Sequence, residues 1–206
     1  MLQNTPRFLR TARVAAPALA AFAMTMAFAG PAAADPSYVT RQSGEVRFAA
    51  LPGEQNTVTF GPGPGGTLRV TDTTSTLTAG PGCTQVDIHT VHCGSLATVT
   101  RIQASLGNQN DSLVNNTAVP SDVDGGAGED TLTGGGGNDR LTDPDGWNAS
   151  TGSSTTFDGR GGNDTIVSRN GGFDRILCGG GFDIVVADQA ALDTVPTGAS
   201  CEFVIR

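Results

Sequence analysis

The sequence contains no lysine, and its twelve basic residues are all arginine, scattered among twenty acidic residues. The formal net charge is −8 at pH 7. A chain of this kind lacks the clustered cations that contact a phosphate backbone. We therefore expect no nucleic-acid partner.

Large apolar side chains are also scarce. Aromatic residues make up 5% of the chain, whereas glycine occurs 29 times. The segment from Ser37 to about Ala104 shows no sustained helical period, only short β-type runs separated by Gly- and Pro-rich turns. These shortages argue against a broad conventional core and favour an all-β protein of short strands.

The motifs of common enzyme classes are missing as well. The sequence has no GxSxG, HExxH, Walker or Rossmann motif, and GPGPGG from Gly61 is interrupted by proline. Its two histidines, His89 and His92, give little support for a catalytic base, and the pair Asp122 and Asp124 is explained by chance in an Asp-rich chain. We expect no enzymatic activity.

The N-terminal 34 residues contain the longest apolar run. Three arginines precede about 15 apolar residues, and Ala32 to Ala34 form a small-residue cleavage site before Asp35. A membrane anchor is the alternative, but a span needs ~20 residues. We expect a signal peptide over 1–34, a secreted protein with no membrane span after cleavage, and a mature chain of nine arginines against twenty acids, a formal charge of −11.

Sixteen of the twenty acidic residues are Asp, and many of them lie in a nine-residue repeat. GGAGEDTLT from Gly125 and GGGGNDRLT from Gly134 both fit GGxGxDxUx, in which U is a large apolar residue. Looser copies begin at Gly159 (GRGGNDTIV), Arg169 (RNGGFDRIL) and Cys178 (CGGGFDIVV). Each copy places Asp two residues before the apolar position, which predicts a tight turn followed by a short strand.

These residue types predict a calcium site. Glycine-rich turns can direct backbone carbonyl oxygens inward, and Asp adds a hard anionic oxygen. Ca²⁺ takes six to eight such ligands, whereas Zn²⁺ prefers His and Cys, and Mg²⁺ prefers smaller sites that retain water. Because one turn supplies too few ligands, we expect stacked turns to share ions. The candidate ligands are Asp111, Gly125, Gly126, Gly128, Asp130, Gly134, Gly135, Gly137, Asp139, Gly159, Gly162, Asp164, Gly172, Asp174, Gly179, Gly181 and Asp183.

In these repeats the chain resembles the RTX-type (hemolysin-type) nonapeptide family, and residues 178–206 resemble the closing segment of secreted actinobacterial calcium-binding proteins. The resemblance implies a right-handed parallel β-roll (β-helix) in which two nonapeptides form one coil. We therefore expect an irregular N-terminal β segment over 35–105, which leads into the roll, and a calcium-binding roll over 106–206. Inward-facing Leu132, Leu141, Ile166, Ile176 and Val185 would form its apolar ladder.

Alternation of successive repeats predicts two edges of the roll. Asp139, Asp164 and Asp183 would line one edge, and Asp111, Asp130 and Asp174 the other. The phase also places Thr155 where a ligand Asp is expected, so we expect a weak site at Asp174. Residues 143–149, which include Trp147, would protrude as a loop.

Four cysteines in an exported chain suggest two disulfides. Among three possible pairings we favour the local ones, Cys83 with Cys93 across a hairpin-like stretch and Cys178 with Cys201 at the C-terminal cap. A zinc site of Cys83, His89, His92 and Cys93 is the less favoured alternative.

Together these features predict a secreted, non-enzymatic calcium-binding protein whose structural ions drive folding after export. Two alternatives belong to other classes. One is a cell-wall or carbohydrate-binding adhesin that contacts a surface or glycan partner through the 143–149 loop. The other is a secreted hydrolase or lytic protein with its active part in 35–105.

Overall fold

A computed structural model describes residues 36–144 and 154–206. The predicted signal peptide, and the predicted loop from residue 145 onward with Trp147, lie outside the described residues. Residues from Ala33 to Arg206 form one compact unit. In the described part of that unit, no helix is long and apolar enough to cross a membrane.

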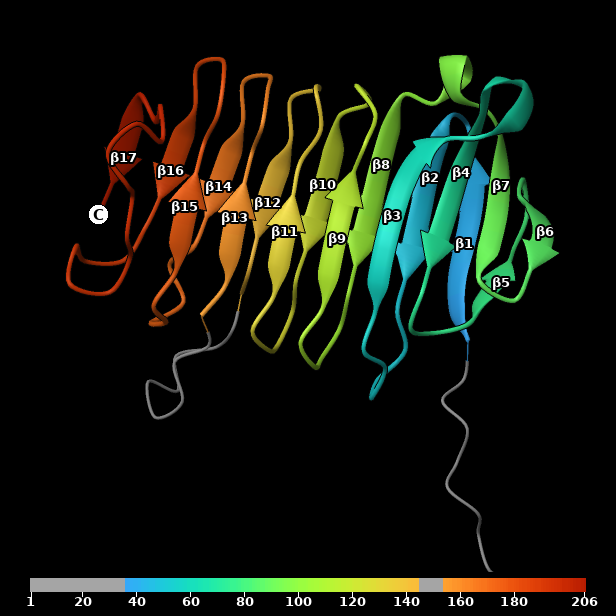
Figure 1. Ribbon diagram of the computed structural model, residues 1–206, viewed down its shortest axis with the longest axis horizontal. Helices are drawn as coiled ribbons and strands as arrows, with labels where there is room; N and C mark the ends of the chain where they lie inside the picture. The colour runs from blue at the N-terminus through green and yellow to red at the C-terminus, as the bar shows by residue number, and fades with distance from the viewer. Residues whose placement is uncertain (1–35, 145–153) are drawn as a thin grey trace, which may run out of the picture. The chain divides into compact units, whose positions relative to one another are not determined.

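The described chain is almost entirely β-structure, as predicted, and its strands form two mixed sheets that face each other (Figure 1). Sheet A has the order β17 (Phe203–Ile205), β16 (Ile184–Val186), β14 (Thr165–Val167), β12 (Arg140–Thr142), β10 (Ser121–Asp124), β8 (Arg101–Ser105), β2 (Glu45–Ala49), β1 (Ser37–Gln42) and β5 (Leu77–Ala79). Sheet B has the order β15 (Arg175–Leu177), β13 (Thr156–Asp158), β11 (Thr131–Thr133), β9 (Ser112–Asn115), β3 (Thr57–Pro62), β4 (Thr67–Asp72), β7 (Thr90–Ser95) and β6 (Thr84–Asp87). Two 3₁₀ turns, η1 (Pro64–Gly66) and η2 (Leu96–Thr98), complete the described elements.

From β8 to β16 successive strands alternate between the two sheets, and each strand pairs in parallel with the strand two places further along the chain. One coil of the chain therefore crosses both sheets, and each sheet gains one strand per coil. Such pairing gives each of these strands except β15, the end strand of sheet B, a hydrogen-bonded neighbour on both sides, although most of these strands are only three residues long.

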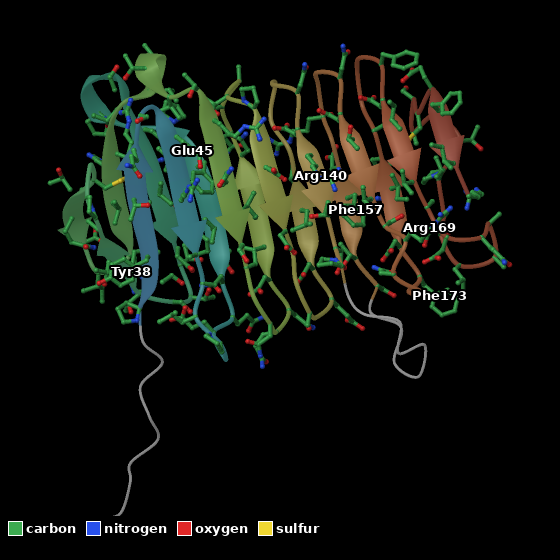
Figure 2. The ribbon with its side chains drawn as sticks, turned by 180° about the vertical axis from the view of Figure 1, so that it is seen from behind. Tyr38, Glu45, Arg140, Phe157, Arg169 and Phe173 are labelled. Atoms are coloured by element: carbon green, nitrogen blue, oxygen red, sulfur yellow. A yellow bond between two sulfur atoms is a disulfide. The ribbon has the colours of Figure 1, made fainter. Side chains whose placement is uncertain are left out.

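The predicted apolar ladder is confirmed. Every repeat places its apolar residue in the interior, with neighbouring coils in register: Leu113, Leu132, Phe157 and Ile176 in sheet B, and Val123, Leu141, Ile166 and Val185 in sheet A. All eight are fully buried, and each such side chain stabilises the fold by roughly 1.5–3 kcal/mol. Figure 2 labels Phe157, one of these buried residues. It also labels Arg140, which directly precedes the buried Leu141 in β12 and is exposed.

The segment before residue 106 continues both sheets but differs from the expected irregular coils. Only β2 and β3 pair in parallel with the strands of the repeats, through β8 and β9. Of the other pairings, β1–β2, β3–β4 and β6–β7 are antiparallel because short connections return the chain beside the strand it has just left. The β4–β7 pair is also antiparallel although β5 and β6 lie between them in the chain, and β1 pairs with β5 in parallel. Between β1 and β2 the turn consists of Ser43 and Gly44, both with positive φ, as the right-handed strand twist favours. One apolar core runs from Val39 to Ala187 through both parts of the chain.

Both predicted disulfides are present. Cys83 pairs with Cys93 and Cys178 with Cys201, which removes the thiolates that a zinc site would need. The first bond spans a hairpin, since the run TQVDIHTV divides into the antiparallel strands β6 and β7. The second bond joins the last glycine-rich repeat to the segment before β17. The two disulfides are consistent with an extracellular protein.

The two disulfides should differ in their effect on stability. They close sequence separations of 10 and 23 residues, so loop entropy predicts that the double Ala variant of Cys178 and Cys201 loses about 3.5 kcal/mol and that of Cys83 and Cys93 about 2.8 kcal/mol. Urea unfolding followed by circular dichroism measures both losses. Unchanged unfolding midpoints in both variants would contradict a stapling role.

Candidate functional site

The turns between strands form two edges of the coiled part of the chain. Turns that lead from sheet A to sheet B define the A-to-B edge, drawn along the bottom of Figure 1, and turns that lead from sheet B to sheet A define the B-to-A edge, drawn along the top. The sixth residue of each repeat lies at the end of its turn, directly before the strand. The structure thus separates the repeat residues into two rows, as alternation predicted.

A ladder of hydrogen bonds joins the residues of each row. On the B-to-A edge the backbone N–H of Ser121 donates to Asp139 Oδ1, that of Asp139 to Asp164 Oδ1 and that of Asp164 to Asp183 Oδ1, over 2.7–2.8 Å. On the A-to-B edge the N–H of Asn56 donates to Asp111 Oδ1 and that of Asp111 to Asp130 Oδ1, over 2.7 and 2.8 Å. Each carboxylate therefore reaches across one coil step of ~4.8 Å, a distance that suits the short side chain of Asp.

Two acidic residues that the repeat motif does not identify extend these rows. The N–H of Asp183 donates to Glu202 Oε2 over 2.8 Å, and the N–H of Asp174 donates to Asp193 Oδ1 over 3.3 Å. Their turns lack the glycine pattern, so a search for GGxGxD passes over them. The available signal is the offset of two residues to the following apolar residue, in Asp193-Thr194-Val195 and Glu202-Phe203-Val204.

The carboxylates of the rows are buried. Asp111, Asp130, Asp139, Asp164, Asp174 and Asp183 are 0–3% exposed. The second oxygen, Oδ2, of Asp111, Asp164, Asp174 and Asp183 is buried without a hydrogen-bond donor, whereas Oδ2 of Asp139 accepts the N–H of Gly135 over 2.6 Å. The ion pairs of Arg47, Arg101 and Arg140 form instead with Glu45 and Asp122 on the outer face of sheet A. A buried carboxylate oxygen without a donor carries a large desolvation cost.

This burial changes the acidity of the rows. Desolvation raises the pKa of Asp111, Asp164 and Asp174 to about 7, and neighbouring carboxylates add to the rise. For Asp174 the added negative charges are those of Asp193 and Asp143. Desolvation also raises the pKa of Asp139 and Asp183. Near neutral pH, the buried carboxylates of each row therefore need either bound protons or a cation to neutralise their charge.

The glycines of the repeats bring the backbone of neighbouring turns very close together. A Cβ added at Gly126, Gly128, Gly135, Gly162, Gly179 or Gly181 would stand between 1.7 and 2.3 Å from a carbonyl oxygen of the preceding turn on the same edge. At Gly137 the corresponding distance is 2.7 Å. These carbonyl oxygens belong to the same turns that hold the buried carboxylates, and those of Gly107, Thr117 and Arg160 accept a backbone N–H from the following turn.

The first residue of a repeat serves a different purpose. A Cβ at Gly125, Gly134 or Gly159 would stand 2.4–2.6 Å from Oδ2 of the Asp in the same repeat. Glycine at this position therefore leaves room for the carboxylate. Gly172 belongs to a different type of turn, in which its N–H donates to Asn170 Oδ1 over 2.7 Å.

The predicted position of Thr155 is confirmed. Its N–H donates to Asp174 Oδ1 over 2.8 Å, and its Oγ1 accepts the N–H of Asp130 over 3.1 Å, so Thr155 occupies the ladder position of an Asp. The hydroxyl of Thr155 also donates to Oδ2 of Asp143, a buried residue in the same turn. The expected protruding segment therefore does not begin at Asp143, whose side chain is directed into the protein.

Within residues 36–144 and 154–206, no three His, Cys, Asp or Glu side chains gather in an arrangement that could hold a metal ion. A cation between two turns would therefore need backbone carbonyls in addition to the carboxylates. Both kinds of donor are hard oxygens, which suits Ca²⁺.

No family model matches the chain, and neither the curated proteins nor the solved structures contain a match.

The close approach of the turns can be tested at two glycines that share a positive φ. Gly181 has a φ of +143° and its added Cβ would stand 1.7 Å from the carbonyl oxygen of Gly162, whereas Gly198 has a φ of +87° and open space around its Cβ position. Because backbone strain affects both Gly181→Ala and Gly198→Ala, the additional clash should make Gly181→Ala more destabilising than Gly198→Ala by ~1–3 kcal/mol. Urea unfolding of the two variants measures the difference, and equal losses would argue against close stacking at this turn.

The raised pKa values predict an unusual response to acid. In excess chelator the folded carboxylates bind protons up to a pKa of about 7, whereas unfolded ones release them near the ordinary value of 3.8. Between these pKa values the folded chain binds more protons, so its stability should fall as pH rises from about 4 to 7. We expect more β signal in circular dichroism at pH 5 than at pH 7.5. A loss of β signal on acidification over this range would contradict the prediction.

Proposed function

We propose that the protein is a secreted calcium-binding β-roll of the RTX type, in which Ca²⁺ is structural and drives folding after export. The observation that carries this proposal is the pair of rows of buried carboxylates, several with an acceptor oxygen that has no donor. A cation between successive turns would supply the missing positive charge to these oxygens. The alternation of parallel strands between two sheets supports the β-roll assignment.

The donor set favours calcium over other common cations. On the B-to-A edge, Asp139, Asp164, Asp183 and Glu202 offer one carboxylate per turn, and the glycine-rich turns add carbonyl oxygens. On the A-to-B edge, Asp111 and Asp130 form a similar pair. Six to eight oxygen ligands of mixed type suit Ca²⁺, whereas Mg²⁺ demands a smaller octahedral set and retains its waters.

Burial supports a structural role for the ion. The six Asp side chains of the two rows are 0–3% exposed, whereas Glu202 at the C-terminal end is exposed, so an ion held between two of these Asp would be enclosed by the turns and not open to a substrate. In the chain itself, the carboxylates link each coil to the preceding one and must be neutralised for the coils to stack. Folding and ion binding are therefore coupled, because the unfolded chain does not bring the turns together.

This coupling suits a protein that leaves the cell. Where free Ca²⁺ is scarce, repulsion between the stacked carboxylates keeps the chain unfolded and competent for export; outside, abundant Ca²⁺ stabilises the coils. The predicted signal peptide over 1–34 and the two disulfides support this proposal. Once the coils have formed, the Cys178–Cys201 bond would hold the C-terminal cap onto them.

The proposal predicts calcium-dependent folding of residues 35–206. In excess chelator at pH 7.5 the circular dichroism should be mainly that of a disordered chain, and Ca²⁺ should restore β signal where equal Mg²⁺ does not. A chelated protein with the same β content and melting temperature as the calcium-loaded protein would overturn the proposal.

An Asp164→Asn variant tests whether the row itself responds to the ion. Asn retains an oxygen to accept the N–H of Asp139 and removes the charge, so the ion-free chain should be no less stable. The calcium-induced stabilisation should shrink, by about 2.7 kcal/mol if one site is lost at a hundred times its dissociation constant. The matched control is Asp122→Asn on the outer face of sheet A, whose ion pairs with Arg101 and Arg140 span 3.6 and 3.9 Å. Equal calcium responses from the two variants would argue against a ligand role for Asp164.

A further inference from the structure

The turn between β12 and β13 has its Asp at the first position and not at the ladder position, unlike the repeats on either side of it. In the repeats from Gly125, Gly134 and Gly159, the first residue is glycine and the sixth is Asp, and the Cβ direction of the glycine points at Oδ2 of that Asp. In the turn between β12 and β13, the first residue is Asp143 and the ladder position is Thr155. Thr155, which lacks the expected carboxylate, and Asp143, which carries one where the other repeats have glycine, thus belong to the same turn.

The contacts of Thr155 and Asp143 divide the two tasks of a repeat Asp between them. Thr155 maintains the ladder, since its N–H donates to Asp174 Oδ1 over 2.8 Å and its Oγ1 accepts the N–H of Asp130 over 3.1 Å. Asp143 brings the negative charge, with Oδ2 accepting the hydroxyl of Thr155. Both side chains are 1% exposed. A carboxylate therefore stands beside the ladder position even though residue 155 has none.

The next turn independently offers an oxygen ligand at the same place. Asp174 is 1% exposed, its Oδ1 is bound to the N–H of Thr155, and its Oδ2 is buried without a hydrogen-bond donor. The carboxylates of Asp143 and Asp174 thus both flank Thr155, one from each of two successive turns on the A-to-B edge. This is the arrangement that two Asp residues of regular repeats would provide.

We propose that Asp143 supplies the carboxylate that Thr155 lacks, so that a calcium site is retained between this turn and the turn that carries Asp174. The inference rests on the proposed calcium function. It replaces the expectation of a weak site at Asp174, which assumed that no carboxylate was present in the turn of Thr155. With Asp143 included, the A-to-B edge has a carboxylate in every turn from Asp111 to Asp193.

A swap of the two residues tests the proposal. Asp143→Gly should remove one bound Ca²⁺ per chain, measured by equilibrium dialysis, and raise the calcium midpoint of folding. The double variant Asp143→Gly/Thr155→Asp recreates the regular pattern of glycine first and Asp sixth. It should return both the ion count and the midpoint to those of the unchanged protein.

Two controls separate this proposal from others. Asp122→Asn should leave the ion count unchanged, and circular dichroism in saturating Ca²⁺ shows whether each variant folds. An unchanged ion count in Asp143→Gly, or a double variant that folds and still lacks the ion, would overturn the role of Asp143. If the unchanged protein binds no Ca²⁺, the proposed function itself fails. If Asp164→Asn loses calcium and Asp143→Gly does not, only the present inference fails.

Discussion

The structure depends on one hydrogen bond that recurs along both edges, from a backbone N–H in one turn to a buried carboxylate in the next. Its donor and acceptor lie one coil apart, as between Asp139 and Asp164 at 2.8 Å, so it sets the spacing and register of the coils as directly as the pairing of three-residue strands does. The same geometry places carboxylates in a row inside the protein, where low polarity strengthens repulsion between them. The carboxylates that link the coils therefore also repel one another, unless a cation or bound protons neutralise their charge.

Glycine makes this arrangement possible in two ways. At the first position of a repeat it leaves space for the carboxylate, and at later positions it allows carbonyl oxygens of the preceding turn to approach the backbone, as at Gly181. Where Asp143 takes the first position, the ladder position carries Thr155, whose hydroxyl donates to that carboxylate.

The two ends of the sheets are completed differently. Before β8, antiparallel strands extend both sheets and carry the Cys83–Cys93 bond within the β6–β7 hairpin. After β16, the Cys178–Cys201 bond and the ladder contact of Glu202 join the last strand, β17, to the coils. A stack of short coils exposes apolar side chains at an open end unless such elements cover it.

Much of this protein is determined by local sequence alone. The two-residue offset from Asp to the apolar residue predicted the buried ladder and the position of Thr155, because side chains alternate strictly between the two faces of a strand. Composition predicted the all-β fold, and proximity in sequence favoured the two disulfides. Only the tertiary structure decided which turns face each other. It revealed that Asp193 and Glu202 extend the rows without the glycine pattern, that several strands before β8 pair antiparallel, and that Asp143 turns inward beside Thr155. These features depend on contacts between residues of neighbouring coils and hairpins, whose partners the chain acquires only when it stacks.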